Sequence, residues 1–259
     1  MDLGIAGRKA IVCASSRGLG KATARALAEA GCEVVVNGRD QKALEETAAE
    51  IAKAAGVKVI PVAADLSTPE GQAALLAACP SPDILINNNG GPKPRDFREL
   101  TRQDIIDGVI ANMVVAIELT QKVIEPMAER RFGRIVNITS GSVKMPLAGL
   151  DLSSGARAGL TAFLAGVART VADRNVTINY VLPGAFDTDR LKSAIAFQAK
   201  QKNVSQEDAA AQRAASIPAK RFGRPDEFGA ACAFLCSAQA GYITGQNLLI
   251  DGGTFNGAF

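Results

Sequence analysis

Hydrophobic positions along the chain form short continuous runs, and these alternate with longer segments in which apolar residues recur with helical spacing. The runs are rich in β-branched residues and lack polar alternation, which predicts strands buried on both faces of a sheet. They fall at residues 9–15, 32–38, 57–63, 83–88, 133–139, 176–182 and 246–251. The helical segments are 18–30, 40–55, 69–79, 101–130, the stretch after Ser153, and 225–237.

This alternation predicts an α/β fold, a Rossmann-type doubly wound parallel sheet with helices on both faces and right-handed crossovers. We find no linker, repeat or low-complexity tract, so residues 1–259 are expected to form a single domain. One segment, at about 188–221, interrupts the rhythm. It is rich in Ala, Gln and Lys and follows a strand end, which predicts a helical insertion that acts as a lid over a substrate.

Composition narrows the class of protein. Hydrophobic residues make up 47% of the chain, enough for a sizeable core. The 29 basic and 26 acidic residues form no basic block, so neither nucleic acid nor a membrane surface is an expected partner. The start of the chain has no apolar stretch of signal-peptide length, and the most apolar helical stretch, 107–120, is too short and too polar to span a bilayer. We therefore expect a cytoplasmic protein.

The chain contains no histidine, which removes several kinds of catalytic site. Ser-His-Asp hydrolysis, Cys-His nucleophiles and His-ligated zinc all need an imidazole, and no metal site is predicted. The cysteines form no C-x-x-C pair, and Cys232 and Cys236 share one face of a predicted helix. They are expected to be buried, reduced thiols.

A glycine-containing turn, "CASSRGLGKATARALAEAG", follows the first predicted strand and opens a helix. Gly18 and Gly20 let the backbone approach a pyrophosphate, which the free N–H groups and dipole of the helix N-terminus attract. A dinucleotide is therefore the expected cofactor. The residues expected to hold it here are Ser15, Ser16, Arg17, Gly18, Leu19 and Gly20.

The end of the second predicted strand favours NADP(H) over NAD(H). A cofactor with free ribose hydroxyls favours an acidic residue at this place, whereas this strand ends in Asn37 and is followed by Arg39. Arg17 is a second guanidinium within reach of a 2′-phosphate. Asp40 adds a negative charge nearby, although it also suits the N-cap of the next helix.

Further motifs, quoted in chain order, carry a family resemblance over nearly the whole chain: "ADL" (64–66), "INNNGG" (86–91), "GRIVNITS" (133–140), "INYVLPG" (178–184) and "ITGQNLLIDGG" (243–253). Together with the glycine turn, they make the chain resemble the short-chain dehydrogenase/reductase family, and most of all its 3-oxoacyl-carrier-protein reductase branch. The resemblance implies about seven parallel strands, a small-molecule substrate, and a homodimer or homotetramer.

The resemblance also implies site residues. Asp65 and Leu66 are expected by the adenine, and Asn112 and Ser140 in the catalytic set. The other expected cofactor-binding residues are Asn88, Asn89 and Gly90 beside the adenosine half, and Pro183, Gly184 and Thr188 at the nicotinamide end.

The chain departs from the family at three places. Its phosphate loop begins Cys13-Ala14 where the family has Thr-Gly, and Asn89 replaces an alanine. The third departure is catalytic: counting from Ser140, the family's tyrosine falls at Ser153 and its lysine at Arg157. In the family the tyrosine exchanges a proton with the substrate oxygen, and the lysine binds the nicotinamide ribose and lowers the tyrosine pKa.

The two replacements have different consequences. Ser153 is too weak an acid to take the tyrosine's role unaided. Arg157 is still expected to donate hydrogen bonds to ribose hydroxyls, and its charge can stabilise an alkoxide, but it cannot relay a proton. The helix is therefore expected to keep its cofactor-positioning role and to lose the usual acid.

Four other groups are candidate proton donors: Ser140 acting through water, Lys144, Asp151 and Tyr180. Each of the last three also has a structural interpretation. Lys144 suits a solvated loop charge, Asp151 a helix N-cap and Tyr180 a core residue. The other tyrosine, Tyr242, is expected to pack near the C-terminal strand.

The function favoured by these residues is an NADP(H)-dependent oxidoreductase that moves a hydride to or from a small carbonyl or alcohol substrate. Losing a general acid typically costs about 10²–10⁴-fold, which slows such an enzyme without abolishing it. One alternative is a reductase of iminium or conjugated C=C substrates. Another is an NADP(H)-binding protein without turnover, acting as a sensor or partner subunit.

Overall fold

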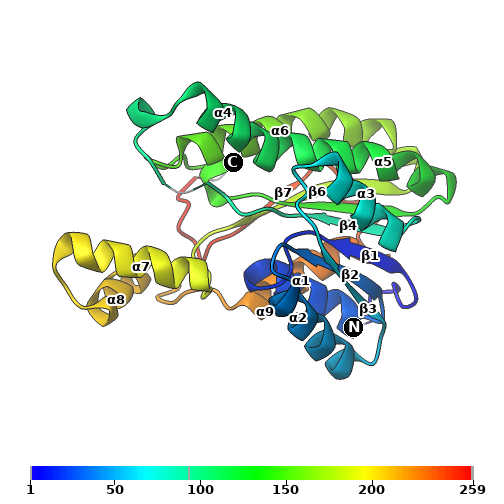
Figure 1. The fold of residues 1–259 in the computed structure, drawn as a ribbon, viewed down its shortest axis with the longest axis horizontal. Helices are drawn as coiled ribbons and strands as arrows, with labels where there is room; N and C mark the ends of the chain where they lie inside the picture. Colours follow the sequence, from blue (N-terminus) through cyan, green and yellow to red (C-terminus); the bar gives the residue numbers. More distant parts are fainter. Residues whose placement is uncertain (1, 93, 258–259) are drawn as a thin grey trace.

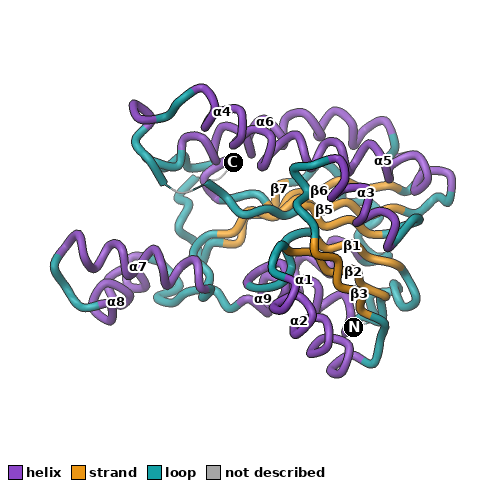
Figure 2. Tube along the Cα trace, in the orientation of Figure 1, coloured by secondary structure: helices purple, strands orange, loops and turns teal. Residues whose placement is uncertain are grey.

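The computed structural model describes residues 2–92 and 94–257, and within them it contains a parallel sheet of seven strands (Figures 1 and 2). The strands are β1 (Lys9–Val12), β2 (Glu33–Gly38), β3 (Val59–Ala63), β4 (Ile84–Asn87), β5 (Gly133–Ile138), β6 (Val176–Pro183) and β7 (Asn247–Ile250).

The order of the strands creates the place where a ligand binds. The order is β3-β2-β1-β4-β5-β6-β7, so the winding reverses between the neighbours β1 and β4. Ligands of open α/β sheets bind outside the carboxyl ends of the strands at such a reversal. The loops 13–17 and 88–91 start there, and the predicted Rossmann-type fold is confirmed.

Helices cover both faces of the sheet, which explains why the strands are apolar throughout (Figure 1). One face is covered by α1 (Gly18–Glu29), α2 (Gln41–Ala55) and α9 (Pro225–Cys236), the other by α3 (Pro69–Ala78), α5 (Val115–Glu129) and α6 (Asp151–Thr170). On the first face Leu27 and Phe228 are completely buried, and on the second Leu119 and Tyr180 are.

The segment predicted to be helical from 101 to 130 is not one uniform α-helix. It starts with α4 (Arg102–Val109), passes through a π-helical stretch, η2 (Ile110–Val114), and continues as α5. Asn112 lies in the π-helical stretch, where its side-chain nitrogen donates to the Gly108 carbonyl at 3.1 Å. Because π-turns often occur at functional sites, this irregularity is consistent with the catalytic role expected of Asn112.

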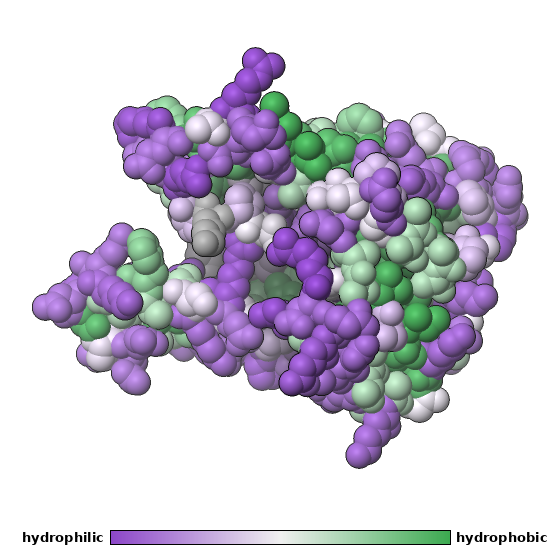
Figure 3. Space-filling model, viewed as in Figure 1, coloured by the Kyte–Doolittle hydropathy of each residue, from purple (hydrophilic) through white to green (hydrophobic). Residues whose placement is uncertain are grey.

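The predicted insertion contains two helices, α7 (Asp189–Lys202) and α8 (Gln206–Ser216), which stand off from the body of the molecule (Figure 1). They share a small core of their own that includes Leu191, Ile195 and Ala209, while Phe197 is largely exposed. The space-filling view shows the surface hollowed between this arm and the α4 end (Figure 3). The lid role of the arm stays a prediction.

Several local expectations need correction. The helix expected after Ser153 begins at Asp151, one residue after its N-cap Leu150, so the N-cap interpretation of Asp151 is wrong by one position. The Asp151 carboxylate instead accepts from the Gly149 N–H. Tyr242 is fully exposed in the turn before β7, so the packing expected of it is wrong.

Two further observations concern the cysteines and the search for membrane-spanning helices. Cys232 and Cys236 are buried free thiols, as predicted. Within the described ranges, no helix combines the length and apolarity needed to cross a membrane.

Candidate active site

The loop after β1 is fixed in shape by hydrogen bonds to β2. Ser15 donates through its N–H to the Asn37 carbonyl at 2.7 Å and through its hydroxyl to the Val12 carbonyl at 2.7 Å. The Ala14 N–H donates to the Asn37 side-chain oxygen at 3.3 Å. Ala14 adopts a positive φ of 45°, a conformation that disfavours any residue with a Cβ, so these bonds hold the loop against strain.

Asn37 and Ser15 act inside the protein. Both side chains are buried, and the Asn37 amide nitrogen donates to the carbonyls of Val62 and Ala64, each at 3.1 Å. The two residues shape the loop and join it to β2 and β3. A direct contact of either with the cofactor stays a prediction.

The start of α1 fits a diphosphate. A Cβ on Gly20 would overlap the Ala14 carbonyl oxygen and lie 2.9 Å from the Asn88 side-chain nitrogen, so only glycine allows the loop to close here. Arg17 is the N-cap and its side chain accepts no hydrogen bond from the first turn, which leaves N–H groups of that turn for an anion. The cradle therefore fits the cofactor expected from the sequence.

The adenosine end lies beside β2 and β3. The pKa of the Asp65 carboxyl is lowered, mainly by hydrogen bonds from Ser67 and to a smaller extent by the charge of Arg39. Arg39 and Arg17 are both exposed. Asp65 and Arg39 thus lie within electrostatic reach of each other, and both guanidinium groups are free of the core for a 2′-phosphate.

The loop after β4 closes the other side of the cleft. Asn88 donates from its side chain to the Ala14 carbonyl at 3.1 Å, which ties this loop to the phosphate loop. Asn89 donates from its side chain to the Ala111 carbonyl at 2.7 Å, at the edge of the π-helical stretch. Asn89 therefore adds a hydrogen bond between the loop after β4 and η2.

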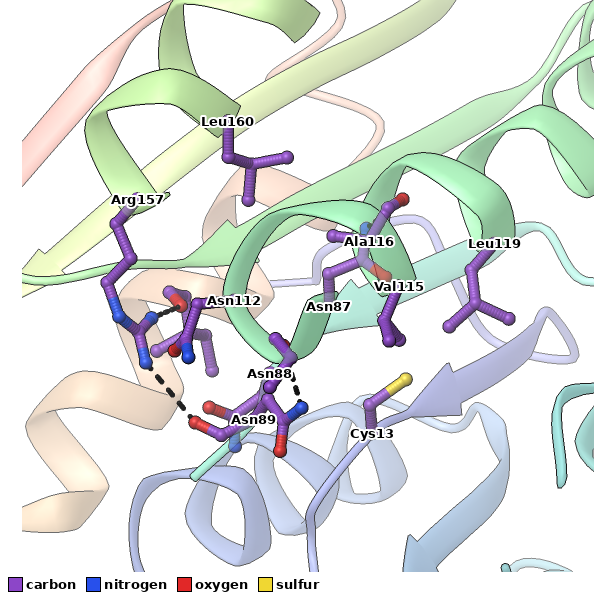
Figure 4. A pocket seen from close by; sticks show the side chains of 12 residues that line it. Cys13, Asn87, Asn88, Asn89, Asn112, Val115, Ala116, Leu119, Arg157 and Leu160 are labelled. Carbon is purple, nitrogen blue, oxygen red and sulfur yellow. Dashed lines mark hydrogen bonds between the residues drawn. The ribbon is translucent and has the colours of Figure 1, made fainter. Parts of the chain in front are cut away.

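Arg157 is the centre of the site. Its guanidinium is buried and makes four hydrogen bonds. The acceptors are the Ser153 hydroxyl at 3.2 Å, the Ile138 carbonyl at 2.7 Å, the Thr139 carbonyl at 3.1 Å and the Asn89 carbonyl at 3.3 Å. The side chain joins α6 to the carboxyl ends of β4 and β5 (Figure 4). Of its five N–H donors, one has no acceptor among the described residues and is left for a ligand.

Arg157 is charged at neutral pH. Burial and, to a smaller extent, the positive charge of Arg190 together lower the pKa of its guanidinium to about 10. Ser153 is also buried and accepts the Arg157 Nε–H. The site therefore holds a fixed positive charge and a buried alkyl hydroxyl that are hydrogen-bonded to each other.

Ser140 is arranged to donate a hydrogen bond. Its side-chain oxygen accepts from the Ser142 N–H at 3.1 Å and from the Ser142 hydroxyl at 2.9 Å. These two bonds leave the Ser140 hydroxyl hydrogen free to point elsewhere. Ser140 can therefore donate a hydrogen bond to a substrate oxygen while Ser142 holds the Ser140 oxygen from behind.

A pocket whose empty volume, open solvent included, is about 330 Å³ lies between the loop after β4, η2, α5 and α6 (Figure 4). Arg157 enters it from α6 and Asn112 from η2. The Asn112 side-chain oxygen is buried without a hydrogen-bond partner among the described residues, so it is available to a donor on a ligand or water. Cys13 also lines the pocket, and burial raises the pKa of its thiol to about 12, which keeps it protonated.

The other candidate proton donors are placed less well. Tyr180 is completely buried in the core between the sheet and α5–α6, and burial raises the pKa of its phenol, which favours its interpretation as a core residue. Lys144 has its ammonium 5.5 Å from the centre of the Phe255 ring, at the end of the loop after β5. It lies near Ser140 along the chain but packs on an aromatic ring.

Two residues of the site are not among those predicted. Ser142 supports Ser140, and the repeated serine in "SGS" is the only sequence signal for it. Arg190 comes from the first turn of α7 and its guanidinium lies against Gly91. Its position depends on where α7 crosses the β4 loop, which no local motif reveals.

The chain is similar to known proteins over most of its length. A family model described as enoyl-(acyl carrier protein) reductase matches residues 13–254. The chain is 33% identical over 252 residues to the NADPH-dependent reductase BacG of Bacillus subtilis, covering 95% of this chain and 97% of that protein. It is also 33% identical over 259 residues to the 3-oxoacyl-[acyl-carrier-protein] reductase FabG of Aquifex aeolicus, covering 98% and 100%.

Solved structures agree over the same length. YwfH, an NADPH-dependent reductase involved in bacilysin biosynthesis, superposes with a TM-score of 0.91 at 32% identity, covering 97% of this chain and 100% of that one. The L-sorbose reductase of Gluconobacter frateurii in complex with NADPH and L-sorbose gives a TM-score of 0.94 at 28% identity, covering 99% and 100%.

Proposed function

Because the chain belongs to the short-chain dehydrogenase/reductase family, we propose that it is an NADPH-dependent reductase that works without the family's phenol donor. The named relatives support NADP(H) as the cofactor and an oxidoreductase reaction. The observation that supports catalysis without a phenol is Arg157. It is a buried cation whose hydrogen bonds join Ser153 to the ends of β4 and β5.

The residues of this site have separate roles in the proposed reaction. When bound, the cofactor supplies the hydride. The α1 N-terminus and the β4 loop would hold its phosphates and ribose, and Arg157 would place a fixed positive charge near the substrate oxygen. Ser140 donates a hydrogen bond to the substrate oxygen, with Ser142 behind it. Water supplies the net proton, since neither a serine nor an arginine is a general acid at neutral pH.

A second candidate reaction is favoured by the same arrangement. A buried guanidinium and two hydroxyls stabilise a developing oxyanion well and supply a proton poorly. Reduction of a conjugated C=C bond forms an enolate that needs such stabilisation first and a proton later. We therefore include conjugated carbonyl compounds, and iminium compounds that need no proton on oxygen, among the substrates.

Homodimer or homotetramer formation and a cytoplasmic location are part of the proposal. Phe163 on α6 and Phe234 on α9 are large apolar side chains that are 50% and 40% exposed, which favours contact with a second copy.

The test is enzyme-dependent loss of NADPH absorbance over a panel of simple ketones, conjugated enones and cyclic imines, with NADPH affinity measured separately by fluorescence. We expect turnover of at least one class, and its loss on Ser140→Ala. The matched control is Ser154→Ala, because Ser154 lies next to Ser153 on α6 but donates to the Leu150 carbonyl. NADPH binding with no turnover of any compound would favour the binding protein without turnover instead.

A further inference from the structure

Two guanidinium groups converge on one short loop. Arg157 donates to the Asn89 carbonyl at 3.3 Å, from beneath the loop after β4. Arg190 reaches the same loop from α7, and its guanidinium is so close that a Cβ on Gly91 would lie 2.8 Å from one of its nitrogens. Glycine at position 91 is what leaves room for this approach.

No carboxylate balances these two charges. In the part of the chain that the structure describes, neither arginine forms an ion pair. Of the acidic residues on nearby elements, Asp187 faces Lys192 at 3.7 Å and Asp151 accepts from the Gly149 N–H. Two like charges around a mostly buried site repel each other, and an anion placed against them would relieve that cost.

The side chain of Arg190 extends away from the phosphate cradle, toward Gly91 in the loop after β4. Thr188, the N-cap of α7, lies against Gly18 in the phosphate loop, with its methyl carbon 3.8 Å from a Cβ built there. Two residues later the side chain of Arg190 extends to Gly91, on the β4 side of the cleft where Arg157 lies. The diphosphate of the cofactor already has the α1 N-terminus, so the arginine pair is available to another anion.

We propose that Arg157 and Arg190 together bind an anionic group of the substrate, a carboxylate or a phosphate, and that the enzyme therefore reduces small acidic molecules. This inference rests on the proposed reductase function. Arg190 belongs to the first turn of the arm, so an anion bound by it also holds α7 against the β4 loop. One N–H of Arg157 and the planar fork of Arg190 suit the oxygens of such a group.

The test is binding to the NADPH-loaded protein, read from cofactor fluorescence and thermal shift. The probes are pyruvate, acetoacetate and levulinate, each compared with its methyl ester. We expect at least one acid to bind about tenfold or more tightly than its ester. Arg190→Gln should abolish that preference and leave NADPH affinity within about twofold of wild type, and Arg190→Lys should keep part of the preference because it keeps the charge.

Lys192→Gln is the matched control, since Lys192 lies on the same helix but faces Asp187. It should leave the preference for acids unchanged. The proposal is wrong if every acid binds no better than its ester, if the preference survives Arg190→Gln, or if Arg190→Gln weakens NADPH binding itself. That last result would assign Arg190 to the cofactor diphosphate. Acid binding without NADPH oxidation would support the anion site and contradict the reductase function.

Discussion

The phosphate end and the catalytic end of the cleft are both proposed to depart from the family pattern, with different consequences. At the phosphate end, Ala14 adopts a positive φ, and its N–H donates to the side chain of Asn37 in β2, which holds the loop in position. At the catalytic end, Arg157 donates to Ser153 and to the end of β5, and under the proposed function no phenol acts there.

The difference follows from what each end contributes. The phosphate cradle is made of backbone N–H groups and close approaches, so a side-chain change there alters strain more than chemistry. The catalytic end acts through the side chains that face the substrate oxygen, so a change there alters which reactions are possible. The predictions below test each half of this comparison.

The largest effect is expected from Gly20→Ala. The new Cβ would overlap the Ala14 carbonyl and push the Asn88 side chain, so the cradle cannot close. We expect NADPH affinity, measured by fluorescence titration, to fall about a hundredfold or more. Gly155→Ala in α6 is the matched control, since its added Cβ meets no atom within 4 Å, and it should bind NADPH normally. Unchanged affinity in Gly20→Ala would place the phosphates elsewhere.

The double change Ser153→Tyr with Arg157→Lys introduces the pair that the family resemblance implies at the catalytic end. We expect reduction of simple ketones to remain as slow as in the unchanged protein and activity on the best panel substrate to fall by about 10²-fold or more. The reason is that one ammonium cannot replace the four hydrogen bonds of Arg157. Steady-state rates of both single variants and the double variant check this. A more than additive rise in ketone reduction would instead show a weakened ordinary reductase.

At the phosphate end, Arg39→Ala is expected to weaken NADPH binding about tenfold and to leave NADH binding unchanged. Arg39 is exposed at the end of β2 and lies within electrostatic reach of Asp65, where a 2′-phosphate is expected. Parallel titrations with the two cofactors measure the ratio. Equal losses for both cofactors would mean that Arg39 supports the fold of this corner and does not select the phosphate.

The sequence predicted the fold because its signals are local. The apolar runs identify the strands, and the spacing from Ser140 places Ser153 and Arg157 on one helix, where the structure has them four residues apart and hydrogen-bonded. The other cleft residues were expected only from the match of the motifs to the family, and their roles stay predictions.

Other features depend on contacts that are distant in sequence. Asn37 is polar and lies at a strand end, which is typical of a residue that faces a ligand. Its side-chain amide instead donates to the carbonyls of Val62 in β3 and of Ala64 just after β3. The π-helical stretch around Asn112 lies in an apolar segment, and no pattern in the sequence of that segment signals it. Arg190 joins the site only because α7 passes the β4 loop.

A smaller effect is expected from Ala14→Gly. Glycine adopts the observed φ of 45° without the Cβ penalty, so the loop loses strain. We expect the free energy of unfolding to rise by about 1 kcal/mol and NADPH affinity to rise a few-fold. Denaturant titration with and without NADPH separates the two effects. A loss of affinity would show that Ala14 has been selected for the shape of this loop, which would make the phosphate end as specialised as the catalytic end.

The smallest effect is expected from pH, because the charge at the catalytic end belongs to a buried arginine. Burial lowers the pKa of Arg157 to about 10 and raises that of Cys13 to about 12, so neither changes charge between about pH 7 and 9. NADPH affinity at constant ionic strength should therefore stay within about twofold over that range. The unfolded chain holds the arginine proton more tightly than the folded one, so this group makes the fold more stable, not less, as the pH rises through about 10. A tenfold loss of affinity below pH 9 can then come neither from Arg157 nor from unfolding driven by it, and would reveal a titrating group that the site as described does not contain.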